Sequence, residues 1–79
     1  MNEKDLNVWV LTIRGACGMS QEEFAEAVGI SRNTLNAIER GRYKISRVQC
    51  NAIMNFANIK LAEGHPAITA LFNAGMLKN

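Results

Sequence analysis

Apolar residues recur at steps of three and four along most of the chain, without the alternation of a β-strand. The first such segment predicts a helix over 3–17, which Gly18 ends in a left-handed conformation. One stripe of this helix is apolar: Leu6, Trp9, Val10, Ile13 and Cys17. Val8 and Leu11 fall outside the stripe, so they are expected either to be partly exposed or to meet the C-terminal segment.

Two short helices with a glycine between them are predicted next. Ser20 and Glu23 have the spacing of a capping box, in which the hydroxyl and the carboxylate each accept a main-chain N–H at the helix start. The helix that follows is expected to end at Gly29, and Ser31 then caps a third helix that ends at Gly41. The expected core positions of the two helices are Phe24, Ala25, Val28, Leu35 and Ile38.

The C-terminal half predicts two more helices. Ser46 and Gln49 form a second capping box, and the helix after it ends at either Asn58 or Ala62, because the apolar pattern fits both. Its expected core stripe is Cys50, Ile53, Met54 and Ala57. Pro66 suits the first position of a helix over 66–74, and the final "GMLKN" is expected to be a tail. The fold class is therefore all-α, a compact bundle of about five helices.

A chain of 79 residues can bury one small core, so residues 1–79 are expected to form a single domain without a roomy catalytic cleft. Cys17 and Cys50 are interpreted as buried thiols rather than metal ligands or a disulfide, since neither belongs to a C-x-x-C pair. His65 is interpreted as a helix-boundary residue. We therefore expect no enzyme activity, cofactor, metal or small-molecule ligand.

The apolar residues are not gathered into the run of ~20 that a membrane span needs, so no span is predicted. The N-terminal apolar patch follows Glu3 and Asp5 and is interrupted by Arg14, which argues against a secretory signal. The expected location is the cytoplasm.

Positive charge is concentrated in one part of the chain. The formal net charge is only +2, but residues 32–47 contain five basic residues and one acid. The remainder holds four basic and six acidic residues and is net negative. A polyanion would therefore meet the chain at residues 32–47.

The segment after Gly29 carries Ser, Arg, Asn and Thr, whereas a surface that served only solubility would use Glu and Lys. Two short helices around a glycine turn, with polar side chains at the start of the second, are the arrangement of a helix-turn-helix. Arginine and asparagine carry paired groups that match the edges of guanine and adenine in the DNA major groove. The polar segment, "SRNTLN", therefore predicts a DNA-reading helix.

The segment "MSQEEFAEAVGISRNTLNAIERG" resembles the motif of the phage Cro and repressor type of helix-turn-helix protein, the XRE family. The dense match covers the motif at 20–41, and a looser one covers 6–57. The resemblance implies a lambda-repressor-like DNA-binding fold and double-stranded operator DNA as the ligand.

The resemblance also implies roles by position. Arg32 and Asn33 fall where the family's principal base-reading residues lie, and Asn36 and Ala37 fall one turn later, where further contacts are made. Gln21 corresponds to a glutamine that binds a phosphate and can brace the first reading residue. The alternative for each of the polar residues is an ordinary solvated side chain.

Further residues are expected to contact the DNA backbone around the end of the third helix and the start of the fourth. These phosphate-binding candidates are Ser31, Arg40, Arg42, Tyr43, Lys44 and Arg47. Packing over the loop is an equal alternative for Tyr43. By resemblance, Arg14 is expected to pair with Glu39 and to clamp the first helix against the third.

The C-terminal segment departs from the family pattern, so the subunit arrangement is open. Such domains generally bind two-fold related half-sites, which makes a homodimer on a palindromic operator the expectation. The segment 59–79 offers six candidates for the interface: Ile59, Leu61, Leu71, Phe72, Met76 and Leu77. The alternative is that they close the core of the single chain.

The sequence thus predicts a small transcriptional regulator, most simply a repressor in the nucleoid of a bacterium or encoded by a phage. The alternative is an antitoxin-type interaction module whose main role is to bind a partner protein. Chains of this kind include phage repressors, restriction-modification controllers, antitoxins and counter-defence regulators, and the residues do not choose among them.

Overall fold

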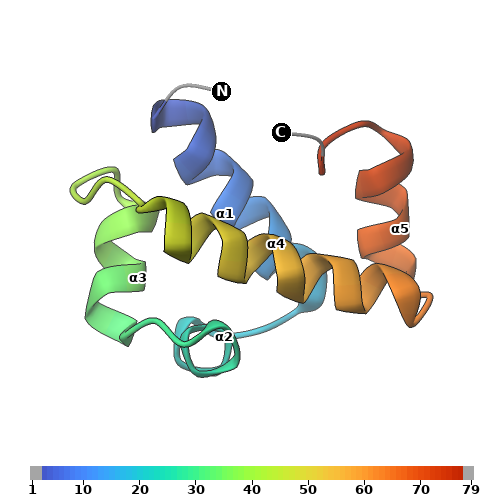
Figure 1. The fold of residues 1–79 in the computed structure, drawn as a ribbon, viewed down its shortest axis with the longest axis horizontal. Helices are drawn as coiled ribbons and strands as arrows, with labels where there is room; N and C mark the ends of the chain where they lie inside the picture. Colours follow the sequence, from blue (N-terminus) through green and yellow to red (C-terminus); the bar gives the residue numbers. More distant parts are fainter. Residues whose placement is uncertain (1–2, 78–79) are drawn as a thin grey trace.

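The computed structural model describes residues 3–77 and contains five α-helices in that part of the chain, without a strand. The helices are α1 (Glu3–Cys17), α2 (Gln21–Val28), α3 (Arg32–Glu39), α4 (Arg47–Ala62) and α5 (Pro66–Asn73). In Figure 1, α4 runs across the middle of the molecule, with α3 at one end and α5 at the other. The all-α prediction is confirmed.

The predicted caps fix the start of each helix of the motif. At α2 the Ser20 hydroxyl accepts from the Glu23 N–H at 3.1 Å, and the Glu23 carboxylate accepts from the Ser20 N–H at 2.9 Å. The turn passes through Gly29, whose φ of 73° is left-handed. Ser31 then caps α3 by accepting from the Thr34 N–H at 3.1 Å. Both capping predictions are confirmed.

The end of α3 requires a glycine because of its backbone conformation. Gly41 has a φ of +73°, a conformation that L side chains rarely adopt. A Cβ at this position would also lie 2.7 Å from Nδ2 of Asn7 on α1. The loop after α3 therefore passes against α1, and its Ile45 is buried in the core.

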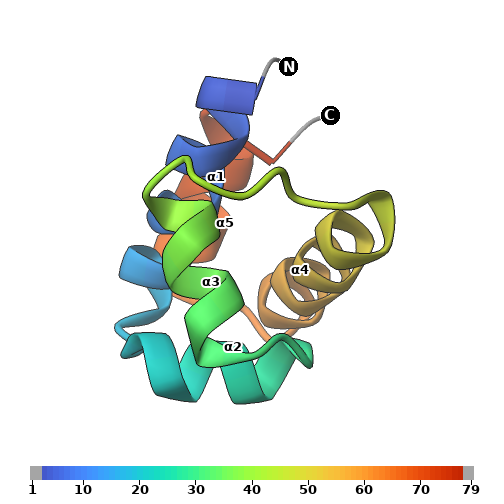
Figure 2. The same cartoon turned by 90° about the vertical axis from the view of Figure 1, so that its left-hand side faces the viewer.

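One hydrophobic core joins all five helices. Its largest fully buried side chains are Phe24, Ile13, Leu35, Ile38, Ile53, Ile68 and Val10. Phe24 of α2 meets Phe56 of α4 edge to face, with ring centroids 5.6 Å apart. Figure 2 shows α2 crossing below α3, with α4 beside them on the right. Val8 and Leu11 lie outside the core and are exposed.

The structure shows where the fourth helix ends and how the last described residues pack. The fourth helix takes the longer alternative and continues to Ala62. The prediction of a C-terminal tail is wrong for residues 75–77, because Leu77 is only 6% exposed and belongs to the core cluster. Residues 78–79 lie outside the described part. The boundary role of His65 is confirmed, since its Nδ1 accepts from the Ile68 N–H at 3.3 Å and caps α5.

The two cysteines are less enclosed than predicted. Cys17 and Cys50 are free thiols and only partly buried, at the edge of the core. Burial raises the pKa of both thiols, although the nearby Lys60 charge opposes this rise at Cys17. Among the described residues, none of the helices is long and apolar enough to cross a membrane.

Candidate nucleic-acid interface

The helix α3 divides its side chains between the core and the surface. Leu35 and Ile38 are fully buried, whereas Arg32 and Asn33 at the start of the helix are exposed. Asn36 and Ala37 are partly buried and lie between these two faces. Because the apolar side anchors the helix in the core, the polar side is held outward in a fixed orientation.

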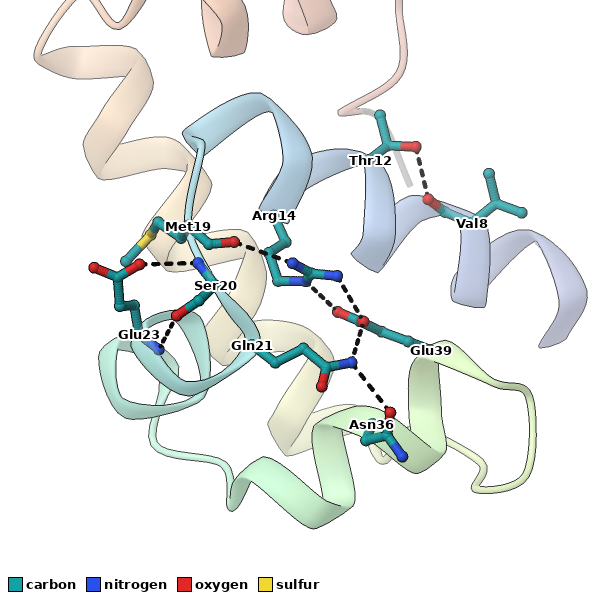
Figure 3. A network of polar contacts seen from close by, with 9 residues as sticks. All are labelled: Val8, Thr12, Arg14, Met19, Ser20, Gln21, Glu23, Asn36 and Glu39. Carbon is teal, nitrogen blue, oxygen red and sulfur yellow. Dashed lines mark hydrogen bonds and ion pairs between the residues drawn. The ribbon is translucent and has the colours of Figure 1, made fainter.

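An ion pair attaches α3 to α1. Arg14 donates from Nε to Oε2 of Glu39 at 2.7 Å and from Nη2 to Oε1 at 3.0 Å, so the contact is two-pronged. The Glu39 side chain is only 4% exposed, whereas that of Arg14 is 22% exposed. Arg14 also donates from Nη1 to the Met19 carbonyl at 3.0 Å, which ties down the loop before α2 (Figure 3). The pair of Arg14 and Glu39 that the resemblance implied is therefore present.

Gln21 of α2 completes the network. Its Nε2 donates to Oε1 of Glu39 at 2.8 Å and to Oδ1 of Asn36 at 3.2 Å (Figure 3). The side-chain amide has two hydrogens, and each serves one of these acceptors. Gln21 therefore braces Asn36, whereas the first reading residue implied by the resemblance is Arg32. The contact of Gln21 with a DNA phosphate stays a prediction. The main-chain N–H groups at the start of α2 could donate to the same phosphate.

Four basic side chains and one tyrosine are exposed on neighbouring segments of the chain, and we call this group the basic rim. It follows the end of α3, the loop after it and the start of α4, and all its members are exposed: Arg40, Arg42, Tyr43, Lys44 and Arg47. The rim adjoins the C-terminal end of α3, so a polyanion lying along α3 would also meet it (Figure 1).

The serine hydroxyls beside this surface already have partners inside the protein. Besides capping α3, Ser31 donates its hydroxyl to Oγ1 of Thr34 at 2.8 Å. Ser46 accepts from the Gln49 N–H at 3.1 Å at the start of α4. The backbone N–H groups of the first helical turns are the donors that such caps leave for a phosphate. The phosphate contact of Ser31 stays a prediction.

The six interface candidates of the C-terminal segment fall into two groups. Ile59, Phe72 and Met76 are 57%, 46% and 43% exposed, respectively. Leu61 and Leu71 are packed against the core, and Leu77 is a member of it. These three side chains therefore help to close the core of the single chain, which was the alternative to a dimer interface. The structure thus leaves three of the six side chains accessible to a second chain.

Sequence reasoning missed the roles of Asn7 and of the Gln21–Asn36 contact. Asn7 lines a pocket between α1 and the loop after α3, together with Leu6, Gly41 and Tyr43. Gly41 at the predicted end of the third helix indicated a turn, but it did not indicate that Asn7 of the first helix lies against this turn. Gln21 and Asn36 lie on different helices, and no local pattern links them.

Comparison with known proteins identifies the family. Residues 10–63, more than half of the chain, match the family described as Helix-turn-helix. The chain belongs to this family, and the resemblance drawn from the motif is confirmed. It is 45% identical over 40 residues to an uncharacterized HTH-type transcriptional regulator of Methanothermobacter thermautotrophicus. That match covers 51% of this chain and 58% of the relative, which is less than two thirds of the relative's length. No solved structure matches the chain significantly.

Proposed function

We propose that this protein is a sequence-specific double-stranded DNA-binding transcriptional regulator, with α3 as the reading helix. The observation that carries the proposal is the presentation of Arg32 and Asn33, which are exposed on a helix whose other face is fully buried. Membership of the helix-turn-helix family and a relative named as a transcriptional regulator support it.

Different residues of the proposed DNA-binding surface would contact bases and phosphates, according to their chemistry. Arg32, Asn33, Asn36 and Ala37 would face the base edges, where donors, acceptors and methyl groups distinguish the base pairs. The basic rim would contact phosphates, which set affinity and register without reading sequence. Phosphate contacts also make the affinity fall with rising salt concentration.

We further propose that two chains bind a palindromic operator and that the protein acts as a repressor in the nucleoid. Ile59, Phe72 and Met76 are large apolar side chains that remain exposed and supply candidates for the interface. Phe72 and Met76 belong to the α5 end of the molecule, away from α3, so an interface there leaves α3 uncovered (Figure 1). In that role the protein would repress by occupying the operator.

The same exposed side chains support a second candidate, an interaction module of the antitoxin type. In that role, the α5 end would cover a partner protein, and DNA binding would be weak or secondary. Apolar patches on a surface are common sites for protein partners.

The test is a selection of bound duplexes from a random DNA pool, with the stoichiometry of the winning complex measured by light scattering. A two-fold symmetric consensus bound by two chains is the expected result. An Arg32→Ala/Asn33→Ala double variant should lose the consensus, whereas Asn55→Ala on the exposed side of α4 should keep it. Failure of the wild-type protein to enrich any sequence would contradict the proposal and favour the partner-protein candidate.

A further inference from the structure

The network around Glu39 determines which atom of Asn36 faces outward. A carboxylate accepts hydrogen bonds and cannot donate one, so the Gln21 atom 2.8 Å from Glu39 Oε1 must be the amide nitrogen. That nitrogen can only donate, so the Asn36 atom 3.2 Å from it must be the amide oxygen. The buried charge of Glu39 thus sets the orientation of both amides in turn.

The consequence is visible in Figure 3, where Oδ1 of Asn36 points toward Gln21 and the amide nitrogen points away from the network. An asparagine that reads adenine uses both groups, its oxygen accepting from N6 and its nitrogen donating to N7. Asn36 has its oxygen turned to a neighbouring helix and so presents only its N–H groups. Glu39 and Gln21 are both needed for this orientation.

We propose that Gln21 is a specificity-determining positioning residue, which holds Asn36 as a hydrogen-bond donor and directs it to an acceptor edge, guanine or thymine, instead of adenine. The inference rests on the proposed function, because it supposes that α3 lies in the major groove. Guanine offers N7 and O6 as acceptors and thymine offers O4, whereas adenine offers the acceptor N7 beside the donor N6, which needs the asparagine oxygen as its partner.

The experiment repeats the selection of bound duplexes with the wild type, Asn36→Ala and Gln21→Met. Asn36→Ala identifies the base pair that Asn36 reads, as the position whose preference is lost. At that position the wild type should favour guanine or thymine over adenine by about fivefold to tenfold. Gln21→Met should reduce this preference by a similar factor and leave the other positions unchanged. Glu22→Met, one residue along on the exposed side of α2, is the matched control and should change no preference.

Two results would overturn the inference while leaving the proposed function intact. One is an adenine preference at the Asn36 position of the wild type. The other is a Gln21→Met variant that weakens binding to all sequences alike, as the loss of a phosphate contact would. A wild type that selects no sequence would instead overturn the proposed function, and this inference with it.

A second measurement needs neither DNA nor a variant that might misfold. Proton exchange of the Gln21 side-chain amide, followed by NMR on the free wild-type protein, should be slow for both hydrogens, because both are bonded. The side-chain amides of Asn51 and Asn55, which are exposed on α4, supply the reference exchange rate. Exchange of either Gln21 hydrogen at that reference rate would overturn the orientation of Asn36 directly.

Discussion

At the scale of single residues, Glu39 is the centre of the helix-turn-helix. Its carboxylate is almost fully buried and accepts two hydrogen bonds from Arg14 and one from Gln21. Three charge-assisted bonds compensate for the loss of hydration that burial causes. One side chain thus connects α1, α2 and α3 and holds the proposed reading surface in place.

Removing Arg14 should leave this carboxylate buried without its counter-charge. We expect Arg14→Met to lower the free energy of unfolding by about 3 kcal/mol. Urea unfolding followed by the fluorescence of the buried Trp9 measures the change, since Trp9 is the only tryptophan. In a double-mutant cycle with Glu39→Met, the double variant should lose less than the sum of the single losses. Additive losses would show that the two side chains act independently.

Single residues of the proposed interface should also differ in what they contribute. Arg32→Ala should cost about 1 to 3 kcal/mol of binding on the selected sequence and relax the preference at one base pair. Arg47→Ala on the basic rim should weaken binding to all sequences and lower the salt dependence, since it removes one phosphate contact. Titrations on the selected and a scrambled duplex, at several salt concentrations, separate the two effects. Equal losses of Arg32→Ala on both duplexes would remove it from the reading set.

At the scale of elements, local chemistry decides where the helices begin. The helices α2 and α4 have the same capping box, but one uses Glu23 and the other uses Gln49 at the third position. Hydrogen bonds from the main chain and the side chain of Ser20 lower the pKa of Glu23 below its ordinary value. Only the first box can therefore respond to acid.

The direction of this response follows from the lowered pKa. A carboxylate whose pKa is lower in the folded state adds stability above its unfolded pKa, about 4.5, and this stability is lost as the pH falls through the folded value. Between about pH 3 and pH 6, Glu23→Gln should therefore lose less unfolding free energy on acidification than the wild type. Gln49→Glu should lose more, because it makes the second box titratable. Parallel pH curves for the three proteins, measured by urea unfolding, would contradict this assignment.

At the scale of the whole molecule, the C-terminal segment places its apolar side chains in two environments that its composition does not distinguish. Leu77 closes the core, whereas Phe72 is 46% exposed on the same end of the chain. Leu77→Ala should lower the unfolding free energy by about 2 kcal/mol or more, by the loss of buried apolar contacts. Phe72→Ser should change the unfolding of the monomer little and weaken self-association.

Sedimentation over a range of protein concentrations measures the association, and urea unfolding at low concentration measures the monomer. If Phe72→Ser left the association constant unchanged, Phe72 would not belong to the dimer interface. If Leu77→Ala altered association but not monomer unfolding, Leu77 would act between chains and not within the core.

The helices and the family could be predicted from local sequence patterns. Capping residues, glycines and apolar periodicity act over three or four positions, so they fixed the helix starts, the turn at Gly29 and the helix-turn-helix motif. The resemblance to the family also implied that Arg14 pairs with Glu39, and the structure contains this ion pair.

How the elements cover one another depends on contacts between distant parts of the chain. Helical periodicity tells which face of a helix is apolar, but it does not tell which other segment buries that face. This is why the end of α4 stayed open and why Leu77 was assigned to a tail although it packs in the core. The contact from Gln21 to Asn36 joins two residues that are 15 positions apart on different helices, and it depends on the buried charge of Glu39 on the second helix. The orientation of Asn36 therefore exists only in the folded chain.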